Sequence, residues 1–439
     1  MKLHDYQEVA VSFLKGRDRA GLFLEQGLGK TASVLSALEP RHLPALVVAP
    51  KRVAENTWPE ERDIWRADLS LSVAVGSKRE RADALGRPAD ITVISQDNIK
   101  DTAPFRNNFN TLVIDESTGY KSSGGVRFLT AAALSTRARH CWILTGTPTP
   151  NGYQDIWSQI YLLDQGERLG KNITTFRNRF MHLENKLPNG HRIYGMDDGA
   201  DAEIKSLIED ICLYMDSDGR IKLPPVSFPE SRISLPKNVK RFYDTLKKDM
   251  VADMEDLGLV VSADNAGILS NRLSQVAAGF VYEYNPETAI RTAHDLHHEK
   301  IEEVTSLIEQ ATSPVLVAYR YSWEEEYLMA MPGARSVREA GVIQDWNRGD
   351  VPVLVAHPKS AAHGLNLQHG GNHAIWASPD WSLEGWLQLN KRLHRQGQTK
   401  PVVIHKVIAK GTTDPLIYKR LEEKRNIQQD LLDHLMSPM

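Results

Sequence analysis

The stretch that decides the fold is GLFLEQGLGKT, residues 21–31, which is followed by ASVLSALE. An apolar strand runs into a glycine-rich turn and then into a helical pattern, which is the order of a phosphate-binding loop. Gly27 and Gly29 let the backbone wrap phosphate groups, and the helix N-terminus adds positive potential. Lys30 can then meet the β- and γ-phosphates of a nucleotide, and Thr31 can hold Mg²⁺.

The loop departs from the strict pattern at one position, because Leu24 stands where the first glycine is expected. A chance Gly-Lys-Thr at a strand–helix turn is therefore an alternative for the loop taken alone. The surrounding sequence decides between the two readings.

Around the loop, short apolar runs alternate with helix-like stretches. Each run reads as a buried strand and is followed by a loop with Gly, Pro or polar residues; the runs are 20–24, 45–49, 91–95, 111–114 and 141–144. Strand–helix–strand units of this kind predict an α/β fold with a parallel sheet.

The pattern changes in the middle of the chain. The polar, Gly-rich stretch LENKLPNGHRIYGMDDGADAE, residues 183–203, predicts an insertion or connector rather than sheet, and residues 237–280 read as helices. A second alternating region follows, with strands expected at 314–318, 351–356, 373–377 and 402–408, and a charged helix from Thr413. We predict a first lobe at 1–168, a helical insertion and connector at 169–285, and a second lobe at 286–439.

Composition places the chain among ordinary globular proteins. It has 439 residues, 41% of them hydrophobic and 25% charged, a length that suits two domains. Two cysteines and an N-terminus without a long apolar run predict a cytoplasmic protein with no membrane partner. A net charge of −3 argues against a protein that coats nucleic acid, but it does not exclude a local basic groove that contacts phosphates.

An acidic pair ends the expected strand in TLVIDEST, residues 111–118. At a strand end beside a phosphate loop, the carboxylate of Asp115 can hold Mg²⁺, and that of Glu116 can orient and activate an attacking water. An ordinary acidic strand end is the alternative.

A third candidate group lies near the C-terminus, where Gln388, Arg392 and Arg395 have the spacing i, i+4 and i+7. Residues at that spacing share one face of a helix. Two arginines on one face can neutralise charge that builds on a γ-phosphate, whereas a plain basic helix face is the alternative.

Taken together, the motifs resemble superfamily-two helicases. LHDYQ, EQGLGKT, VVAPKRVAENTW, IDEST and LTGTPTPNG occur in the order and spacing of the first lobe of that superfamily. GLNLQ, SPDWSLEGWLQ and HRQGQ resemble the second lobe of its Swi/Snf-like branch, in the short form found in phages and bacteria. Thr118 replaces the usual histidine of the acidic box, and Lys391 replaces the usual glycine before Arg392.

The resemblance implies two RecA-like parallel-sheet lobes that use ATP and Mg²⁺, and it assigns residues to roles. It implies adenine recognition by Gln7 with Tyr6, metal binding by Thr31 and Asp115, and charge neutralisation by Arg392 and Arg395. The remaining nucleotide-binding residues are Gly27, Gly29, Lys30, Gly364 and Gln388. The residues that would grip the nucleic-acid backbone are Lys51, Arg52, Ser95, Gln96, Arg320, Ser360 and Trp381.

The function implied by the resemblance is an ATP-dependent translocase on double-stranded DNA. A strand-separating helicase on DNA or RNA would share every ATPase residue and is the first alternative. A non-catalytic, nucleotide-gated clamp is the second, and the presence of Lys30, Glu116 and Arg395 argues against it.

Overall fold

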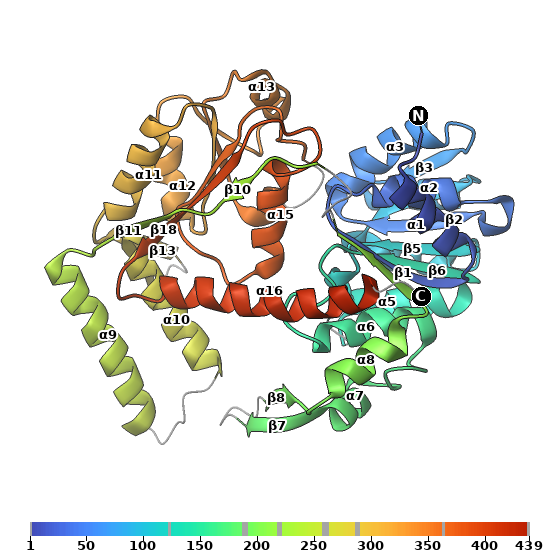
Figure 1. Ribbon diagram of the computed structural model, residues 1–439, viewed down its shortest axis with the longest axis horizontal. Helices are drawn as coiled ribbons and strands as arrows, with labels where there is room; N and C mark the ends of the chain where they lie inside the picture. Colours follow the sequence, from blue (N-terminus) through green and yellow to red (C-terminus); the bar gives the residue numbers. More distant parts are fainter. Residues whose placement is uncertain are drawn as a thin grey trace. The chain divides into compact units, whose positions relative to one another are not determined.

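The computed structural model describes residues 2–121, 124–186, 192–216, 222–256, 263–285, 290–361 and 365–436. The chain forms two compact units (Figure 1). Unit 1 consists of Met1–His182, Gly195–Lys222 and Lys424–Met439, and unit 2 consists of Leu183–Tyr194 and Leu223–Glu423. Each unit is built around its own parallel sheet.

Within the described residues, the sheet of unit 1 has seven strands in the order β3-β4-β2-β5-β6-β1-β9, and all of its pairings are parallel. The strands are β1 (Arg19–Leu24), β2 (Ala45–Ala49), β3 (Leu71–Ala74), β4 (Ile91–Ser95), β5 (Thr111–Asp115), β6 (His140–Leu144) and β9 (Cys212–Met215). This order makes β5, β6 and β1 neighbours, so the loops that follow these three strands share one edge of the sheet.

Alternate residues of the central strands enter two separate cores. Leu46 and Val48 of β2 pack on one face of the sheet, and Ala45 and Val47 pack on the other. Helices α5 (Val126–Arg137), α6 (Gln154–Asp164), α7 (Ile173–Phe180) and α8 (Ala200–Ile208) contribute to the first core. Helices α1 (Asp5–Lys15), α2 (Lys30–Ala37) and α3 (Trp58–Trp65) contribute to the second. A strand that is buried on both faces needs a continuous apolar run, and the sequence of β2 supplies one.

Unit 2 follows the same plan. Its sheet has the strand order β10-β18-β17-β14-β16-β15, with β11 also paired to β18. The strands are β10 (Val226–Ser227), β11 (Glu230–Ile233), β14 (Val315–Ala318), β15 (Ala334–Ser336), β16 (Val353–Ala356), β17 (His373–Trp376) and β18 (Val402–Ala409). The helices around it are α11 (Glu299–Gln310), α12 (Ser322–Met329), α13 (Val342–Arg348), α14 (Pro358–Ala361) and α15 (Leu383–Leu393).

The predicted α/β class with two parallel-sheet lobes is confirmed. The helices expected in residues 237–280 are α9 (Lys237–Asp256) and α10 (Ala263–Ala278), and a hairpin of β12 (Phe280–Asn285) and β13 (Ile290–Asp295) follows. Across the described part of the chain, every helix is too short or too polar to span a bilayer.

The prediction that residues 183–203 contain no sheet was wrong. Strands β7 (Met181–Lys186) and β8 (Arg192–Met196) form a two-stranded sheet there. Strand β9, a little further along, joins the sheet of unit 1 beside β1. The polar composition concealed the hairpin, because a two-stranded ribbon does not need an apolar run on both faces.

The expected C-terminal helix is α16 (Asp414–Met436), and its last turns belong to unit 1. There Leu431 is fully buried in the core shared with α5 and α6. The carboxylate of Asp430 accepts hydrogen bonds from the Tyr153 hydroxyl at 3.0 Å and from Lys205 Nζ at 2.6 Å. The division into parts at 168 and 285 stays a prediction, distinct from these two units.

Candidate nucleotide site and nucleic-acid interface

The phosphate loop lies where the sequence placed it, between β1 and α2. Gly27 and Gly29 have positive φ angles of 92° and 75°, which glycine adopts without strain. A Cβ on Gly29 would lie 2.2 Å from Nε2 of Gln7, so a larger residue would clash as well. Lys30 begins α2 and its Nζ donates to the carbonyl of Leu24 at 3.0 Å, which closes the loop on itself.

The departure from the strict loop pattern has a structural reason. Leu24 is the last residue of β1, and its side chain is fully buried in the core beside α1 and α2. The turn therefore starts after Leu24, and the leucine side chain fills the core at a position where a glycine would leave a gap.

Gln7 ties α1 to the phosphate loop. The side chain is 5% exposed, its Oε1 accepts the backbone N–H of His4 at 2.9 Å, and its Nε2 donates to the carbonyl of Leu28 at 3.3 Å. Tyr6 stacks on the His4 ring with a centroid distance of 5.3 Å. The structure thus brings Gln7 to the phosphate loop, with Tyr6 beside it in the chain, and adenine recognition by these two residues stays a prediction.

Asp115 is the last residue of β5 and is 5% exposed. Its Oδ2 accepts the indole N–H of Trp58 at 3.1 Å, and its Oδ1 accepts the backbone N–H of Glu116 at 3.1 Å. Burial raises the pKa of the Asp115 carboxyl above its usual range, the neighbouring Glu116 charge adds to this, and Lys30 opposes it. A cation bound beside this buried carboxyl group would stabilise its charged form.

Glu116 has a left-handed backbone, with φ of 54°, which is rare for a residue with a side chain. Its Oε2 is buried and has no hydrogen-bond partner among the described residues. Buried polar atoms without partners are uncommon, and strained residues of this kind cluster at functional sites. The carboxylate is therefore placed to accept a proton or a hydrogen bond from a molecule that the protein itself does not supply.

The LTGTPTPN segment follows β6, between β5 and β1 in the sheet. Gly146 packs against the start of the phosphate loop, where an added Cβ would lie 3.2 Å from the Leu24 carbonyl oxygen. The hydroxyls of Thr147 and Thr149 are buried and lack hydrogen-bond partners among the described residues. Three motifs thus meet at the carboxyl ends of three adjacent strands, which is where open α/β sheets bind ligands.

Two residues of this site escaped the sequence analysis. Trp58 is one, since its indole contacts Asp115. Gln159 is the other: it is fully buried on α6, its Oε1 accepts the Ser117 hydroxyl at 2.7 Å, and its Nε2 donates to the Pro148 carbonyl at 2.7 Å. A glutamine within the apolar run IWSQIYLL of α6 was the available signal for this role.

Four of the residues predicted to contact nucleic acid lie at the carboxyl ends of β2 and β4, two strands that pair with Ala49 opposite Ser95. Lys51 is exposed and lies 3.9 Å from Glu55. Ser95 and Gln96 are buried; Ser95 accepts a hydrogen bond from Asn98 at 2.9 Å, and Gln96 from Arg127 at 3.4 Å. Arg52, half-buried, follows Lys51. The structure brings these four predicted residues to one edge of the sheet.

In unit 2, the prediction that Gln388, Arg392 and Arg395 share one helix face was wrong for Arg395. Helix α15 ends at Leu393, because the chain turns at His394. Arg392 and Arg395 nevertheless converge, since Nη1 of each donates to the Leu365 carbonyl at 3.4 Å.

Gln388 and Gly364 are the other two residues of unit 2 that the sequence predicts to bind the nucleotide. Gln388 is 1% exposed and donates to Glu384 at 3.2 Å. Gly364 lies outside the described residues.

The other three residues predicted to contact nucleic acid lie in the segments that follow three adjacent strands of unit 2. Arg320 follows β14, Ser360 follows β16 and Trp381 follows β17. Nη1 of Arg320 donates to the carbonyl of Pro379 at 3.2 Å, which ties two of these loops together. Trp381 is half-buried and packs against a small cluster that includes Ile417 of α16.

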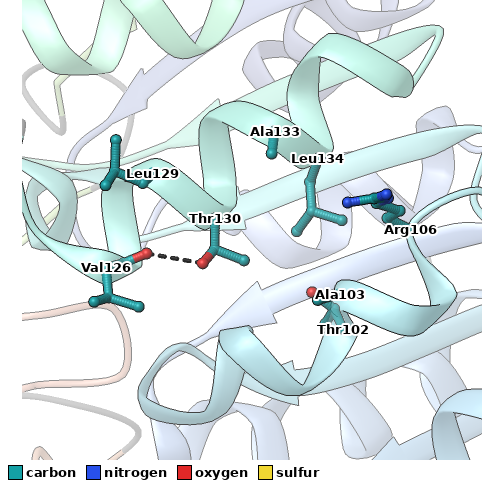
Figure 2. Close-up of a pocket in the computed structure, with 8 residues that line it drawn as sticks. All are labelled: Thr102, Ala103, Arg106, Val126, Leu129, Thr130, Ala133 and Leu134. Carbon is teal, nitrogen blue, oxygen red and sulfur yellow. Dashed lines mark hydrogen bonds between the residues drawn. The ribbon is translucent and has the colours of Figure 1, made fainter.

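A separate pocket of about 270 Å³ opens between α5 and η3 (Gln96–Phe105) (Figure 2). It is lined mainly by apolar side chains, among them Leu129 and Leu134, with Arg106 at one side. None of the predicted site residues lines it.

Comparison with known proteins gives one family match. The model of the family described as the SNF2-related domain matches residues 6–272. The protein p41 of Acyrthosiphon pisum secondary endosymbiont phage 1 is 32% identical, with 98% of this chain and 97% of that protein covered.

Longer relatives match over the same length of this chain. YwqA of Bacillus subtilis is 24% identical, with 98% of this chain and 49% of that protein covered. The mouse DNA annealing helicase and endonuclease ZRANB3 is 23% identical, with 98% of this chain and 41% of that protein covered. The chain thus spans nearly all of the phage protein but less than half of these two.

Solved structures are similar at a lower level of identity. The Sulfolobus solfataricus SWI2/SNF2 ATPase core in complex with dsDNA is 20% identical, with a TM-score of 0.45 over 98% of this chain and 93% of that chain.

Proposed function

Since the chain belongs to the SNF2-related domain family of superfamily-two helicases, we propose that it couples ATP hydrolysis to movement along double-stranded DNA. The family membership confirms the Swi/Snf-like resemblance of the sequence, and with it the class, nucleic-acid-dependent ATPases. Double-stranded DNA as the track and the roles of single residues belong to the proposal.

One observation carries the ATPase part of the proposal. Buried Asp115 ends β5 at the edge of the sheet where β1 leads into the phosphate loop. Glu116, which follows it, is half-buried, and its buried Oε2 atom has no hydrogen-bond partner among the described residues. We assign Glu116 to the attacking water, whose proton its carboxylate would accept. Lys30 would bind the β- and γ-phosphates of ATP once its bond to the Leu24 carbonyl is exchanged for the nucleotide.

The residues present fit Mg²⁺. Asp115 offers a buried carboxylate, and Thr31 offers a hydroxyl in the first turn of α2; oxygen ligands of this kind suit the ion. When bound, Mg²⁺ would neutralise charge on the phosphates of ATP. Asp115 and Thr31 would hold it, while Gly27 and Gly29 leave the loop backbone open to the phosphates.

The arginines of unit 2 complete the proposal. Arg392 and Arg395 converge on the Leu365 carbonyl, so their guanidinium groups lie close together. We propose that they act on the γ-phosphate of the ATP held by unit 1, where positive charge stabilises the transition state. Gln388 and Gly364 belong to the same nucleotide-binding proposal.

Double-stranded DNA as the track is supported by two features. The relative ZRANB3 is named a DNA annealing helicase, and the segments SPDWSLEGWLQ and HRQGQ of this chain resemble the Swi/Snf-like branch more than RNA helicases. The residues proposed to contact the phosphate backbone are Lys51, Arg52, Ser95, Gln96, Arg320, Ser360 and Trp381. Contacts of this type position a protein without reading sequence.

The deciding experiment measures ATP turnover with no nucleic acid, with duplex DNA, with single-stranded DNA and with RNA. We expect duplex DNA to stimulate turnover at least as well as single strands, and RNA to do so poorly. A triplex-displacement assay beside a strand-displacement assay then separates a translocase from a strand-separating helicase. An ATPase that ignores all nucleic acids would overturn the track and leave the ATPase assignment standing.

A further inference from the structure

Helix α3 carries two tryptophans, and each donates its indole N–H to a carboxylate. Nε1 of Trp58 lies 3.1 Å from Oδ2 of Asp115, and Nε1 of Trp65 lies 2.8 Å from Oε2 of Glu61. Trp58 is fully buried and Asp115 nearly so, whereas Trp65 and Glu61 are half-buried at the surface. The two bonds are chemically alike, but only one of them reaches the proposed nucleotide site.

The local chain geometry gives Trp58 this reach. Residues Val53–Thr57 form a π-helical turn directly before α3, and Pro59 stands in the first turn of the helix. Insertions of this kind in a helix often occur at functional sites. The ring of Trp58 is packed in the core beside α1 and α2, so its N–H must find a partner inside the protein, and it finds Asp115.

The Asp115 carboxylate is thereby held at both oxygens, by Trp58 at Oδ2 and by the backbone N–H of Glu116 at Oδ1. Each oxygen can accept more than one hydrogen bond or ligand, so capacity for a cation remains. An indole is a neutral donor, and it fixes the orientation of the carboxylate without cancelling the negative charge that attracts a cation. A lysine or arginine in its place would cancel that charge.

We propose that Trp58 is a positioning residue for the metal site, holding the Asp115 carboxylate in the orientation that binds Mg²⁺ with the nucleotide. The inference rests on the proposed function, in which Asp115 holds the ion. Trp58 itself touches neither nucleotide nor metal in this assignment. It acts by holding the Oδ2 atom of that carboxylate in place through its indole N–H.

The test compares Trp58→Phe with Trp65→Phe in the full chain. Each variant keeps an aromatic ring on α3 and deletes one indole N–H. The measurement is equilibrium binding of a fluorescent ADP analogue over a Mg²⁺ titration, with thermal melting of the nucleotide-free protein as the check on folding. For Trp58→Phe we expect the Mg²⁺ concentration at half-effect to rise about tenfold, as is typical when the partner of a metal ligand is lost. Binding without Mg²⁺ should not change, and Trp65→Phe should behave as the parent chain.

A double-mutant cycle with Asp115→Asn keeps the inference testable if Trp58→Phe also lowers stability. If Trp58 acts through Asp115, adding Trp58→Phe to Asp115→Asn should cause no further change in Mg²⁺ dependence, because interacting residues are not additive. Fully additive effects, or a Trp58→Phe titration that matches Trp65→Phe, would overturn the inference and spare the proposed function. A parent chain whose nucleotide binding ignores Mg²⁺, or an Asp115→Asn variant with unchanged Mg²⁺ dependence, would overturn both.

Discussion

At Glu116 the chain adopts a backbone conformation that costs energy for any residue with a side chain. The buried Oε2 atom adds a second cost, since no described residue hydrogen-bonds to it. Both costs are understandable if the carboxylate is kept ready for a water molecule that attacks a phosphate. Neither would be expected at an ordinary acidic strand end, which was the alternative for this pair.

The first prediction concerns Glu116→Gln. The amide keeps the shape of the side chain but cannot accept the proton of the attacking water, so kcat should fall about a hundredfold or more while ATP affinity stays close to that of the parent. Single-turnover hydrolysis and nucleotide binding measure the two quantities separately. Glu60→Gln, at an exposed position of α3, is the control and should leave both unchanged. Unaltered turnover in Glu116→Gln would remove this residue from the chemistry.

The second prediction concerns Arg395→Ala. Removing a guanidinium that stabilises charge only in the transition state should lower hydrolysis far more than nucleotide affinity, by on the order of a hundredfold in kcat. Arg348→Ala is a suitable control, because Arg348 is an exposed arginine of unit 2 that pairs with Asp345 and Asp350. Hydrolysis by an isolated first lobe at the rate of the full chain would contradict the role of Arg395.

Among the helices and strands, α6 links two of the motifs at the sheet edge. Gln159 accepts the hydroxyl of Ser117, next to the acidic pair, and donates to the carbonyl of Pro148 in the LTGTPTPN segment. All of these atoms lie in a buried region, where a lost partner costs about 1–3 kcal/mol. The bridge therefore fixes the spacing between the loops that follow β5 and β6.

The third prediction is that Gln159→Leu uncouples these loops. The variant leaves the Ser117 hydroxyl and the Pro148 carbonyl without their partner, so we expect a melting temperature lower by several degrees and a larger loss in kcat than in nucleotide affinity. Gln154→Leu is the matched control on the same helix, since Gln154 is half-buried and accepts a hydrogen bond from Arg177 at 3.0 Å, away from the two loops. Equal effects of the two substitutions on turnover would reduce Gln159 to a packing residue.

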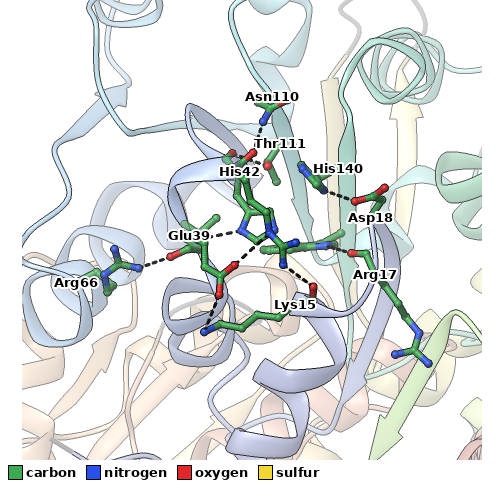
Figure 3. A network of polar contacts seen from close by, with 12 residues as sticks. Lys15, Arg17, Asp18, Glu39, His42, Arg66, Asn110, Thr111 and His140 are labelled. Atoms are coloured by element: carbon green, nitrogen blue, oxygen red, sulfur yellow. Dashed lines mark hydrogen bonds and ion pairs between the residues drawn. The ribbon is translucent and has the colours of Figure 1, made fainter.

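At the opposite ends of β5 and β6 lies a second polar cluster, around His42 (Figure 3). The His42 ring accepts the backbone N–H of Glu39 at 2.9 Å and meets the His140 ring edge-on at 4.7 Å. Burial lowers the pKa of His42 to about 4; the His140 and Arg41 charges add to this, and Glu39 and Asp18 partly oppose it. Protonation of His42 therefore works against the folded state.

The fourth prediction is a loss of stability in acid that depends on His42. The unfolded chain takes up this proton near the ordinary His pKa of 6.5, whereas the folded chain takes it up only near pH 4. The contribution of His42 to the free energy of unfolding is therefore fully present above pH 6.5, and it is lost as the pH falls from 6.5 to about 4. Urea unfolding of the chain and of His42→Gln across this range measures the difference in the free energy of unfolding, on the order of 3 kcal/mol. Asp115, whose pKa is raised, acts in the opposite sense in both proteins and cancels in the comparison. Parallel stability curves would show that His42 does not titrate between the two states.

For the molecule as a whole, the fifth prediction concerns the grip on DNA. Binding through backbone phosphates releases counterions, so duplex-stimulated ATP turnover should fall steeply between low and physiological salt while basal turnover changes little. Trp381→Ala should weaken the stimulation and spare basal hydrolysis. Trp381→Phe, which retains an aromatic ring in the cluster with Ile417, should keep most of it. A Trp381→Ala chain that unfolds would assign the residue to packing.

The sequence by itself determined the family, the two parallel sheets and the phosphate loop. It could do so because these features are local. Continuous apolar runs predict strands that are buried on both faces, and β2 and β4 match their predicted bounds. The glycines beside Lys30 are required by the backbone of the turn itself.

Only the tertiary structure decided the features that depend on distant partners. Strand β9 is defined by its pairing with β1, with Cys212 opposite Gly21, and no local pattern encodes such a pairing. Helical spacing placed Arg395 on α15, but the helix ends at Leu393, and it is the Leu365 carbonyl that brings the arginine back to its neighbour. Trp58 reaches Asp115 only through folding, because a hydrogen bond between distant segments depends on three-dimensional distance, which residue order alone does not give.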